Sequence, residues 1–236
     1  MTLLSICQAA ADEIGITRPS AVAGNTEPEV QRLFRYANKI GNNMMKAVNW
    51  QVLRSEQTFT ASNAELQSGA IPADFDRFVP ETFWDRTNLQ LVTGPVTATE
   101  WGGMKAASYT GNPKFIYRGN EIRIMPTPSG TVSMAFEYVS NKWAASSGGT
   151  AQASLVLDTD VARLDEELIT FGVISEFLIA NGLPATGAVS QYEARYKALI
   201  DNDQPASGIM VAADLFGSGR PFTGEPGTSY NIYNGY

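Results

Sequence analysis

The stretch from residue 114 to residue 139, KFIYRGNEIRIMPTPSGTVSMAFEYV, constrains the fold of this chain more than any other. Apolar and polar residues alternate on both sides of a Gly-Asn pair, and such a pair is typical of a two-residue hairpin turn. A turn at this pair places Arg118 opposite Glu121, so that opposite charges become cross-strand neighbours. On the other face it gathers four apolar residues, which pair as Tyr117 with Ile122 and Phe115 with Ile124. The sequence therefore predicts an antiparallel hairpin with one apolar face.

A third strand is predicted to follow this hairpin. If residues 126–130 form the next loop, the returning strand brings Val132 opposite Ile124. Met134 then lies opposite Ile122. The same apolar face continues through the next alternating residues, Phe136 and Tyr138. Two turn signals and three alternating segments thus predict a three-stranded meander.

Two helices are predicted before the meander. The first spans residues 2–15, because its apolar residues recur at helical spacing and Gly15 supplies a stop signal. The second begins at Thr26-Glu27-Pro28-Glu29, which has the form of a capping box. Behind it one apolar stripe runs for roughly six turns, through Val30, Leu33, Phe34, Ala37, Ile40, Met44 and Val48. Four basic residues lie off that stripe, namely Arg32, Arg35, Lys39 and Lys46.

Weaker signals mark the segments around the meander. Strand-forming residues predict strands over residues 50–60, 77–84 and 89–92, with a turn over residues 71–76. Pro95 is expected to open a short helix over residues 96–106, because a proline near the first helical position costs little. Residues 144–154, AASSGGTAQAS, have the composition of a flexible surface loop, and residues 155–157 predict a brief strand.

Two further helices are predicted after this loop. The first, over residues 161–180, is expected to start from one of three capping residues, Asp158, Thr159 or Asp160. Its apolar residues are too many for a single stripe, so we expect it to be buried against more than one neighbour. The second, over residues 188–200, carries Glu193 and Lys197 as an i,i+4 pair.

Together these elements predict an α+β fold. Helices from the N- and C-terminal parts form one helical bundle, and an antiparallel β-rich lobe is inserted between them. The predicted parts are a bundle of residues 1–49 and 158–200, an inserted β-rich lobe of residues 50–157, and an extended Gly/Pro-rich C-terminal tail of residues 201–236.

The composition argues against several classes of active site. The chain has no histidine, which removes Ser-His-Asp and Cys-His nucleophiles and imidazole metal sites. Cys7 is the one cysteine, so an internal disulfide cannot form and an intracellular setting is expected. The net charge is −7 without a run of Lys or Arg, which does not indicate a surface that grips nucleic acid. Neither a membrane-spanning stretch nor the basic start of a signal peptide is evident.

Two groups of carboxylates are the strongest candidates for chemistry. Asp158, Asp160, Asp165, Glu166 and Glu167 could hold a hard cation, although acidic residues also favour the start of a helix. Asp74, Asp76, Glu81 and Asp85 could supply a glycosidase pair, although such residues are more often charges of turns and exposed strands. We prefer the structural interpretation of both groups, so no catalytic residue, metal or cofactor is expected.

The C-terminal tail contains apolar residues at intervals, which a purely solvating segment would lack. One interpretation is a disordered chain end. The other is a segment that docks on another subunit, with contacts from Ile209, Met210, Val211, Leu215, Phe216, Tyr230, Ile232 and Tyr233. Both interpretations are open at this point.

Several phrases of the sequence resemble the head-to-tail adaptor proteins of tailed bacteriophages, also called connector or neck proteins. These phrases are IPADFDRF, YRGNEIRIMPTP, EYVSNKW, DEELITFGVISEFLIANG and QYEARYKALI. The resemblance covers about residues 1–200, and the group that it points to includes the podophage tail tubular protein A.

The resemblance implies a non-enzymatic virion protein at the head–tail junction, assembled in the host cytoplasm. Such proteins form a homo-oligomeric ring, commonly of twelve copies, between the portal protein and the tail nozzle or tube protein. The helices would form the ring body and the β-rich lobe would face the tail. DNA would pass through the ring during genome ejection without sequence-specific binding, no membrane would be involved, and the tail residues named above would dock on a subunit or on the portal.

Three other functions stay open on the sequence alone. The chain could be another tail or baseplate protein, such as a tail terminator. It could be a glycan hydrolase that uses the carboxylates from Asp74 to Asp85. It could also be a binding module whose meander recognises a glycan or a receptor.

Overall fold

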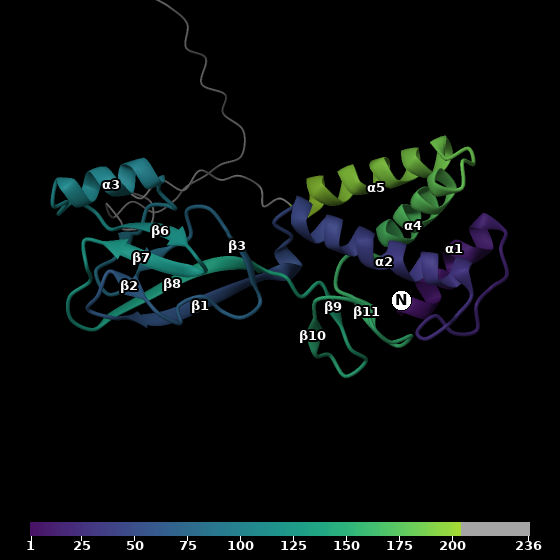
Figure 1. Ribbon diagram of the computed structural model, residues 1–236, viewed down its shortest axis with the longest axis horizontal. Helices are drawn as coiled ribbons and strands as arrows, with labels where there is room; N and C mark the ends of the chain where they lie inside the picture. Colours follow the sequence, from purple (N-terminus) through teal and green to yellow (C-terminus); the bar gives the residue numbers. More distant parts are fainter. Residues whose placement is uncertain (204–236) are drawn as a thin grey trace, which may run out of the picture. The chain divides into compact units, whose positions relative to one another are not determined.

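The structure is a computed structural model, and the unit that it describes spans residues 1–203. The predicted α+β class is confirmed, since this unit contains both helices and antiparallel sheets (Figure 1). Its helices are α1 (Leu3–Ile14), α2 (Pro28–Ala47), α3 (Ala98–Ala106), α4 (Glu166–Ala180) and α5 (Thr186–Asp203). The predicted boundaries between the parts of the chain stay a prediction.

The strands form three antiparallel sheets within the described residues. The largest contains β1 (Arg54–Ala61), β3 (Phe75–Phe78), β4 (Trp84–Asp85), β5 (Gln90–Leu91) and β8 (Val132–Ser140). The second contains β2 (Leu66–Gln67), β6 (Lys114–Arg118) and β7 (Glu121–Met125). The third and smallest contains β9 (Ala144–Ala145), β10 (Ala151–Gln152) and β11 (Val161–Ala162).

Helix α4 lies at the centre of the helical bundle. It packs against α1, α2 and α5, and its buried apolar residues are Leu168, Ile169, Val173, Ile174 and Phe177. The expectation that this helix has several neighbours is confirmed, and all three belong to the same chain. The contact with α2 is close at Gly172, where an added Cβ would lie 2.7 Å from Cγ2 of Ile40.

The predicted capping box at the start of α2 is wrong. Glu27 is the N-cap residue of α2 and makes no side-chain cap hydrogen bond, and Pro28 opens the helix. A capping box forms at α1 instead, where the backbone N–H of Thr2 donates to Oγ of Ser5 at 2.7 Å. The backbone N–H of Ser5 donates in return to Oγ1 of Thr2. The predicted stop of α1 is confirmed, because Gly15 closes that helix in the left-handed conformation at φ 79°.

The predicted cap of α4 is also wrong. The helix begins several residues later than expected, because Asp165 is its N-cap and accepts a 2.8 Å hydrogen bond from the backbone N–H of Leu168. Asp158 and Asp160 are used elsewhere, since their carboxylates hold loops that precede the helix.

The predicted hairpin is confirmed with its register unchanged. Strands β6 and β7 are antiparallel, with Arg118 opposite Glu121 and Phe115 opposite Ile124. Gly119 and Asn120 have φ values of 62° and 63°. Positive φ at both central residues is what a type I′ turn requires.

The predicted pairing of the third strand is wrong. Strand β7 pairs with β2 on its other edge, whereas β8 pairs with β1, β3 and β4 in a separate sheet. The apolar faces of the three segments nevertheless meet in one core. Its members include Phe115, Ile122 and Ile124 from one sheet, and Met134, Phe136 and Tyr138 from the other. The apolar residues thus pack face to face across two sheets and not side by side within one.

Other predicted segments differ in detail. Residues 144–154 are not a flexible loop, because they contain β9 and β10, and residues 155–157 are not a strand. The strand expected over residues 77–84 is divided between β3 and β4, and β1 begins only after a 3₁₀ turn at Gln51–Leu53. Helix α3 starts at Ala98 with Thr97 as its cap, so Pro95 lies before it. None of the helices within residues 1–203 has the length and apolar character that crossing a lipid bilayer requires.

Candidate interaction surfaces

Asp74, the first of the possible glycosidase residues, has structural partners. It accepts hydrogen bonds from the hydroxyls of Tyr138, at 3.0 Å, and Ser140, at 2.7 Å. Burial by itself would raise the pKa of Asp74, but these hydrogen bonds outweigh it and hold the pKa below its ordinary value. A glycosidase acid needs a raised pKa, so Asp74 does not suit that role.

The other three candidates in this region also have separate environments. Asp76 pairs with the guanidinium of Arg77 at 2.6 Å. Asp85 is buried and its Oδ1 accepts hydrogen bonds from backbone N–H groups of the turn that follows it. Glu81 is exposed. The partners of these carboxylates are therefore those of turn residues, and a pair of cooperating carboxylates is not indicated.

The acidic residues before α4 hold loops in place. Oδ1 of Asp158 accepts hydrogen bonds from the backbone N–H groups of Val22 and Ala23, at 2.9 and 2.7 Å. Asp160 is buried, and its Oδ2 accepts three hydrogen bonds, from Gln152, Val156 and Leu157. Burial acts to raise the pKa of Asp160, but these three donors lower it below its ordinary value.

The remaining acidic residues of this group form ion pairs. Asp165 pairs with Arg195 of α5 at 2.8 Å, and Arg195 also reaches Glu167 at 3.1 Å. Glu166 pairs with the N-terminal amine of Met1. In the part of the chain that the structure describes, no three His, Cys, Asp or Glu side chains are grouped so that they could hold a metal ion.

The thiol of Cys7 is not available as a nucleophile. Cys7 is fully buried in α1, and burial, with a smaller effect of the charge on Asp158, raises the pKa of the thiol to about 12. Because the thiolate is the reactive form, the side chain is inert at neutral pH.

Arg77 joins β3 to the end of α2. Its Nη2 donates to the backbone carbonyls of Met45, at 2.9 Å, and Val48, at 2.5 Å, and its Nε donates to Oδ1 of Asn49 at 2.8 Å. The last carbonyls of a helix lack intrahelical partners and carry partial negative charge. The guanidinium of Arg77 supplies N–H donors to these carbonyls and a positive charge beside them, so Arg77 acts as a clamp between α2 and β3.

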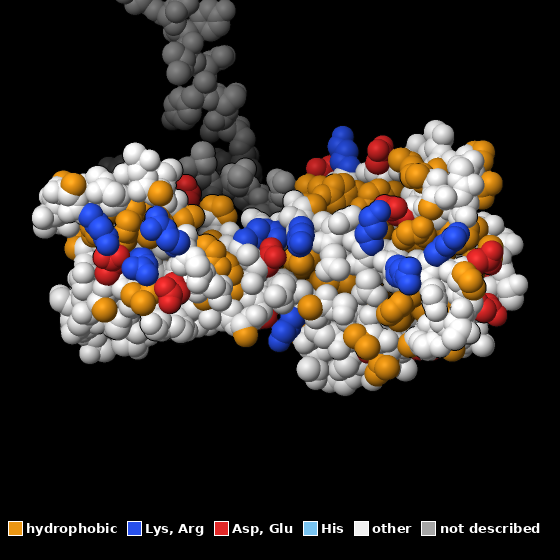
Figure 2. Space-filling model, in the orientation of Figure 1, with side chains coloured by type: hydrophobic (Ala, Val, Ile, Leu, Met, Phe, Trp, Pro, Cys, Tyr) orange, Lys and Arg blue, Asp and Glu red, His pale blue; other side chains and the backbone are white. Residues whose placement is uncertain are grey.

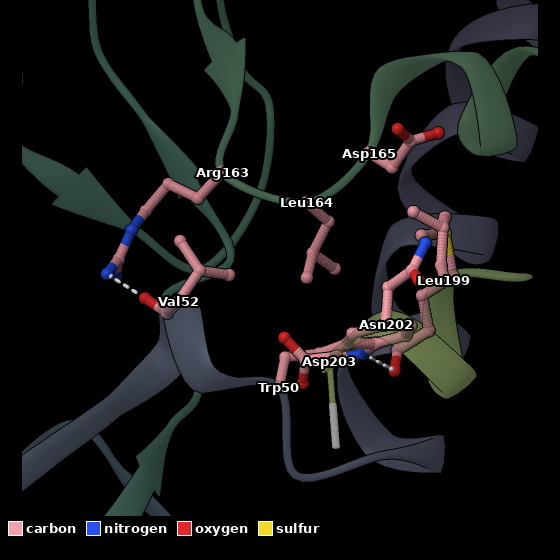
Figure 3. A pocket seen from close by; sticks show the side chains of 9 residues that line it. Trp50, Val52, Arg163, Leu164, Asp165, Leu199, Asn202 and Asp203 are labelled. Atoms are coloured by element: carbon pink, nitrogen blue, oxygen red, sulfur yellow. Dashed lines mark hydrogen bonds between the residues drawn. The ribbon is translucent and has the colours of Figure 1, made fainter. Parts of the chain in front are cut away.

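A cavity of about 220 Å³ lies beside the end of α2 and the end of α5 (Figure 3). Its apolar lining consists of Met44, Trp50, Val52, Leu164 and Leu199, and its polar lining of Arg163, Asp165, Asn202 and Asp203. Arg163 points toward Val52 and donates to its carbonyl at 2.6 Å, and Asp203 accepts from the backbone N–H of Gln51 at 3.0 Å. Since Arg163, Asp165 and Asp203 are already paired and the lining residues include no acid–base pair, the cavity favours apolar contact over catalysis.

The exposed face of α2 is basic. Arg32, Arg35, Lys39 and Lys46 are all exposed, and their spacing places them on one side of the helix. Figure 2 shows basic side chains along this helix. Nζ of Lys39 binds Glu176 of α4 at 2.8 Å, and Nη1 of Arg32 donates to Oδ1 of Asn181 at 3.2 Å. We call these four basic residues the α2 basic stripe.

Comparison with known proteins identifies the family. The family model described as SU10 adaptor protein matches residues 1–213, which includes every helix and strand described above. The chain belongs to the SU10 adaptor protein family. A search of the curated proteins finds no match. The family is one of structural phage adaptors, so this adaptor is a virion component of the head–tail region, and the predicted resemblance to phage adaptors is confirmed at that level.

For the adaptor, the sequence predicted one docking segment and assigned no role to a second surface. The predicted docking residues, Ile209, Met210, Val211, Leu215, Phe216, Tyr230, Ile232 and Tyr233, lie outside the described residues. The four residues of the α2 basic stripe were placed off the apolar stripe of the helix, but no role was assigned to them because they are separated along the chain and no run of basic residues appears. The available signal was their helical spacing, which places them together only once α2 is folded.

Proposed function

We propose that this adaptor joins the portal to the tail as a homo-oligomeric ring through which DNA passes. The observation that carries the proposal is the family match over residues 1–213. The resemblance of the sequence to podophage tail tubular protein A supports a place between the portal protein and the tail nozzle or tube protein. In this proposal the adaptor is not an enzyme, its ring contains about twelve copies, and it assembles in the host cytoplasm.

The charge of the chain supports a passage for DNA. Twelve copies at −7 each carry about −84, and repulsion between like charges keeps a passing duplex from adhering to the ring. The duplex is then guided by the ring without contacts to particular bases.

The C-terminal tail contributes to assembly in this proposal. The residues that we expect to dock on another subunit or on the portal are Ile209, Met210, Val211, Leu215, Phe216, Tyr230, Ile232 and Tyr233. Removing Pro205–Tyr236 should therefore weaken assembly. Unchanged assembly of the truncated chain would refute this role of the tail and leave the ring itself untouched.

Mixing the purified adaptor with portal rings of the same phage tests the proposed function. Electron microscopy should show adaptor copies added to one end of the portal ring. Portals that stay bare at saturating adaptor concentrations would contradict the proposal. Glycan hydrolysis that is lost in Asp76→Asn or Asp85→Asn would replace it with the hydrolase interpretation.

A further inference from the structure

The α2 basic stripe is not explained by the stability of its own helix. Cations are favoured near a helix C-terminus, but of the four only Lys46 lies in the last turn of α2, so the helix dipole does not account for the other three. Lys39 is the only one of the four with an ion pair inside the described residues. The stripe therefore presents largely uncompensated positive charge along one helix face.

Exposed acidic residues lie at the end of α1 and at the start of α2. Asp12 and Glu13 lie in the last turn of α1, where the partial negative charge of the helix end disfavours them. Glu27 and Glu29 follow at the start of α2, and all four carboxylates are exposed. Within residues 1–203 only Asp12 of these four forms an ion pair, with Arg18 at 3.3 Å. We call these four residues the α1–α2 acidic end.

The charge balance favours contact between unlike surfaces of two copies. Helix α2 carries four basic residues and one acidic residue, which is a net charge of +3. Because the net charge of the whole chain is −7, the residues outside α2 carry a net charge of −10. Two stripes facing each other would repel, whereas a stripe that faces an acidic surface of another copy is attracted. A contact between two different surfaces is also the kind of interface that closes into a ring.

We propose that the α2 basic stripe of one copy docks on the α1–α2 acidic end of the next copy. The inference rests on the proposed ring, because it names the surfaces that would hold neighbouring copies together. The stripe already binds a protein carboxylate, that of Glu176, beside Lys39. This ion pair shows that the stripe can bind a carboxylate, and the α1–α2 acidic end of a neighbouring copy would supply exposed carboxylates of the same kind.

Charge reversal on each surface tests the proposal. The stripe variant replaces all four basic residues by glutamate (Arg32→Glu, Arg35→Glu, Lys39→Glu and Lys46→Glu), and the acidic-end variant replaces all four acidic residues by lysine (Asp12→Lys, Glu13→Lys, Glu27→Lys and Glu29→Lys). Each variant alone should assemble at least about a hundredfold more weakly than the unmodified chain, because like charges then face each other. An equimolar mixture of the two should recover assembly, since copies that alternate around the ring pair opposite charges at every interface.

Native mass spectrometry of the full-length chain, with and without portal rings, measures this assembly between 50 and 500 mM NaCl. The unmodified assembly should weaken as salt rises, because screening shortens the reach of exposed charges. Lys197→Glu makes the same charge change as Lys46→Glu at an exposed position of α5, and it should assemble normally. Circular dichroism confirms that each variant is folded.

Several outcomes overturn the inference. Reversed variants that assemble like the unmodified chain, or a mixture that fails to recover, exclude the paired surfaces. Stripe variants that assemble normally but lose binding to duplex DNA or to the portal assign the stripe to that partner instead. A chain that forms no assembly even in its unmodified form, with or without portals, overturns the proposed function as well.

Discussion

Replacing Gly41 by alanine should destabilise the adaptor although alanine is the better helix former. Gly41 lies inside α2, where the indole of Trp143 covers it. A Cβ added at Gly41 would approach three carbon atoms of that ring closer than 3.0 Å. Trp143 is fully buried, and its Nε1 donates to Oδ1 of Asn42 at 3.0 Å, so the ring cannot move aside cheaply.

The size of the effect follows from two opposing contributions. Exchanging a glycine for alanine in a helix interior gains about 1 kcal/mol. Forcing a methyl group into a filled core costs about 1–3 kcal/mol, and the fixed indole places this site at the upper end. We therefore expect Gly41→Ala to lose about 2 kcal/mol of unfolding free energy, which lowers the Tm of a domain of this size by about 4–8 °C.

Thermal and urea unfolding followed by circular dichroism measure this loss. Gly103→Ala in α3 is the matched control, because an added Cβ there meets nothing within 4 Å and the variant should be stabilised by up to about 1 kcal/mol. Combining Gly41→Ala with Trp143→Leu should cost less than the two single changes added together, since the second removes the clash. A Gly41→Ala protein as stable as the unmodified chain would refute the packing argument.

Three further predictions concern Arg77, Cys7 and Asp160. Arg77→Met should lower the unfolding free energy by about 2 kcal/mol, because the carbonyls of Met45 and Val48 lose a charged donor. Urea titration measures this loss, and an unchanged unfolding midpoint would exclude the proposed clamp. Cys7 should not react with a thiol reagent at pH 8 until the protein unfolds, because its pKa is about 12, and rapid labelling of the native chain would contradict its burial. The pKa of Asp160 is lower in the folded chain than the ordinary value of 3.8, so its stabilising contribution is present above about pH 4 and is lost as pH falls through the folded value. Asp160→Asn should therefore lose less stability than the unmodified chain between pH 5 and pH 3 in thermal scans; equal losses would exclude Asp160 as a source of acid sensitivity.

Local signals in the sequence were sufficient to predict the hairpin, but they do not determine which distant strands pair. The register of Arg118 against Glu121 depends on one turn and a short alternation, which are fully visible in the chain. The partners of β8 are β1, β3 and β4, whose paired residues lie far away in the sequence. An apolar face is equally well buried beside a strand or across from it, so Ile124 and Val132 did not reveal which arrangement holds.

Competition among similar residues explains the wrong helix starts. Several acidic residues precede α4, and each is a plausible cap by type. Only the fold shows that Asp158 holds the backbone at Val22 while Asp160 holds its own loop, which leaves Asp165 for the helix. A role for the α2 basic stripe could not be predicted from the sequence for a similar reason. Exposed basic residues at helical spacing usually form a solvated face, and only the fold shows whether a complementary surface exists.

A reconstruction of the head–tail junction in the intact virion tests the central claim most directly. The account predicts a ring of density between portal and tail into which copies of residues 1–203 fit, with the exposed face of α2 from each copy against the α1–α2 acidic end of its neighbour. Density at the portal that these residues do not fit, with this chain located elsewhere in the particle, would contradict it.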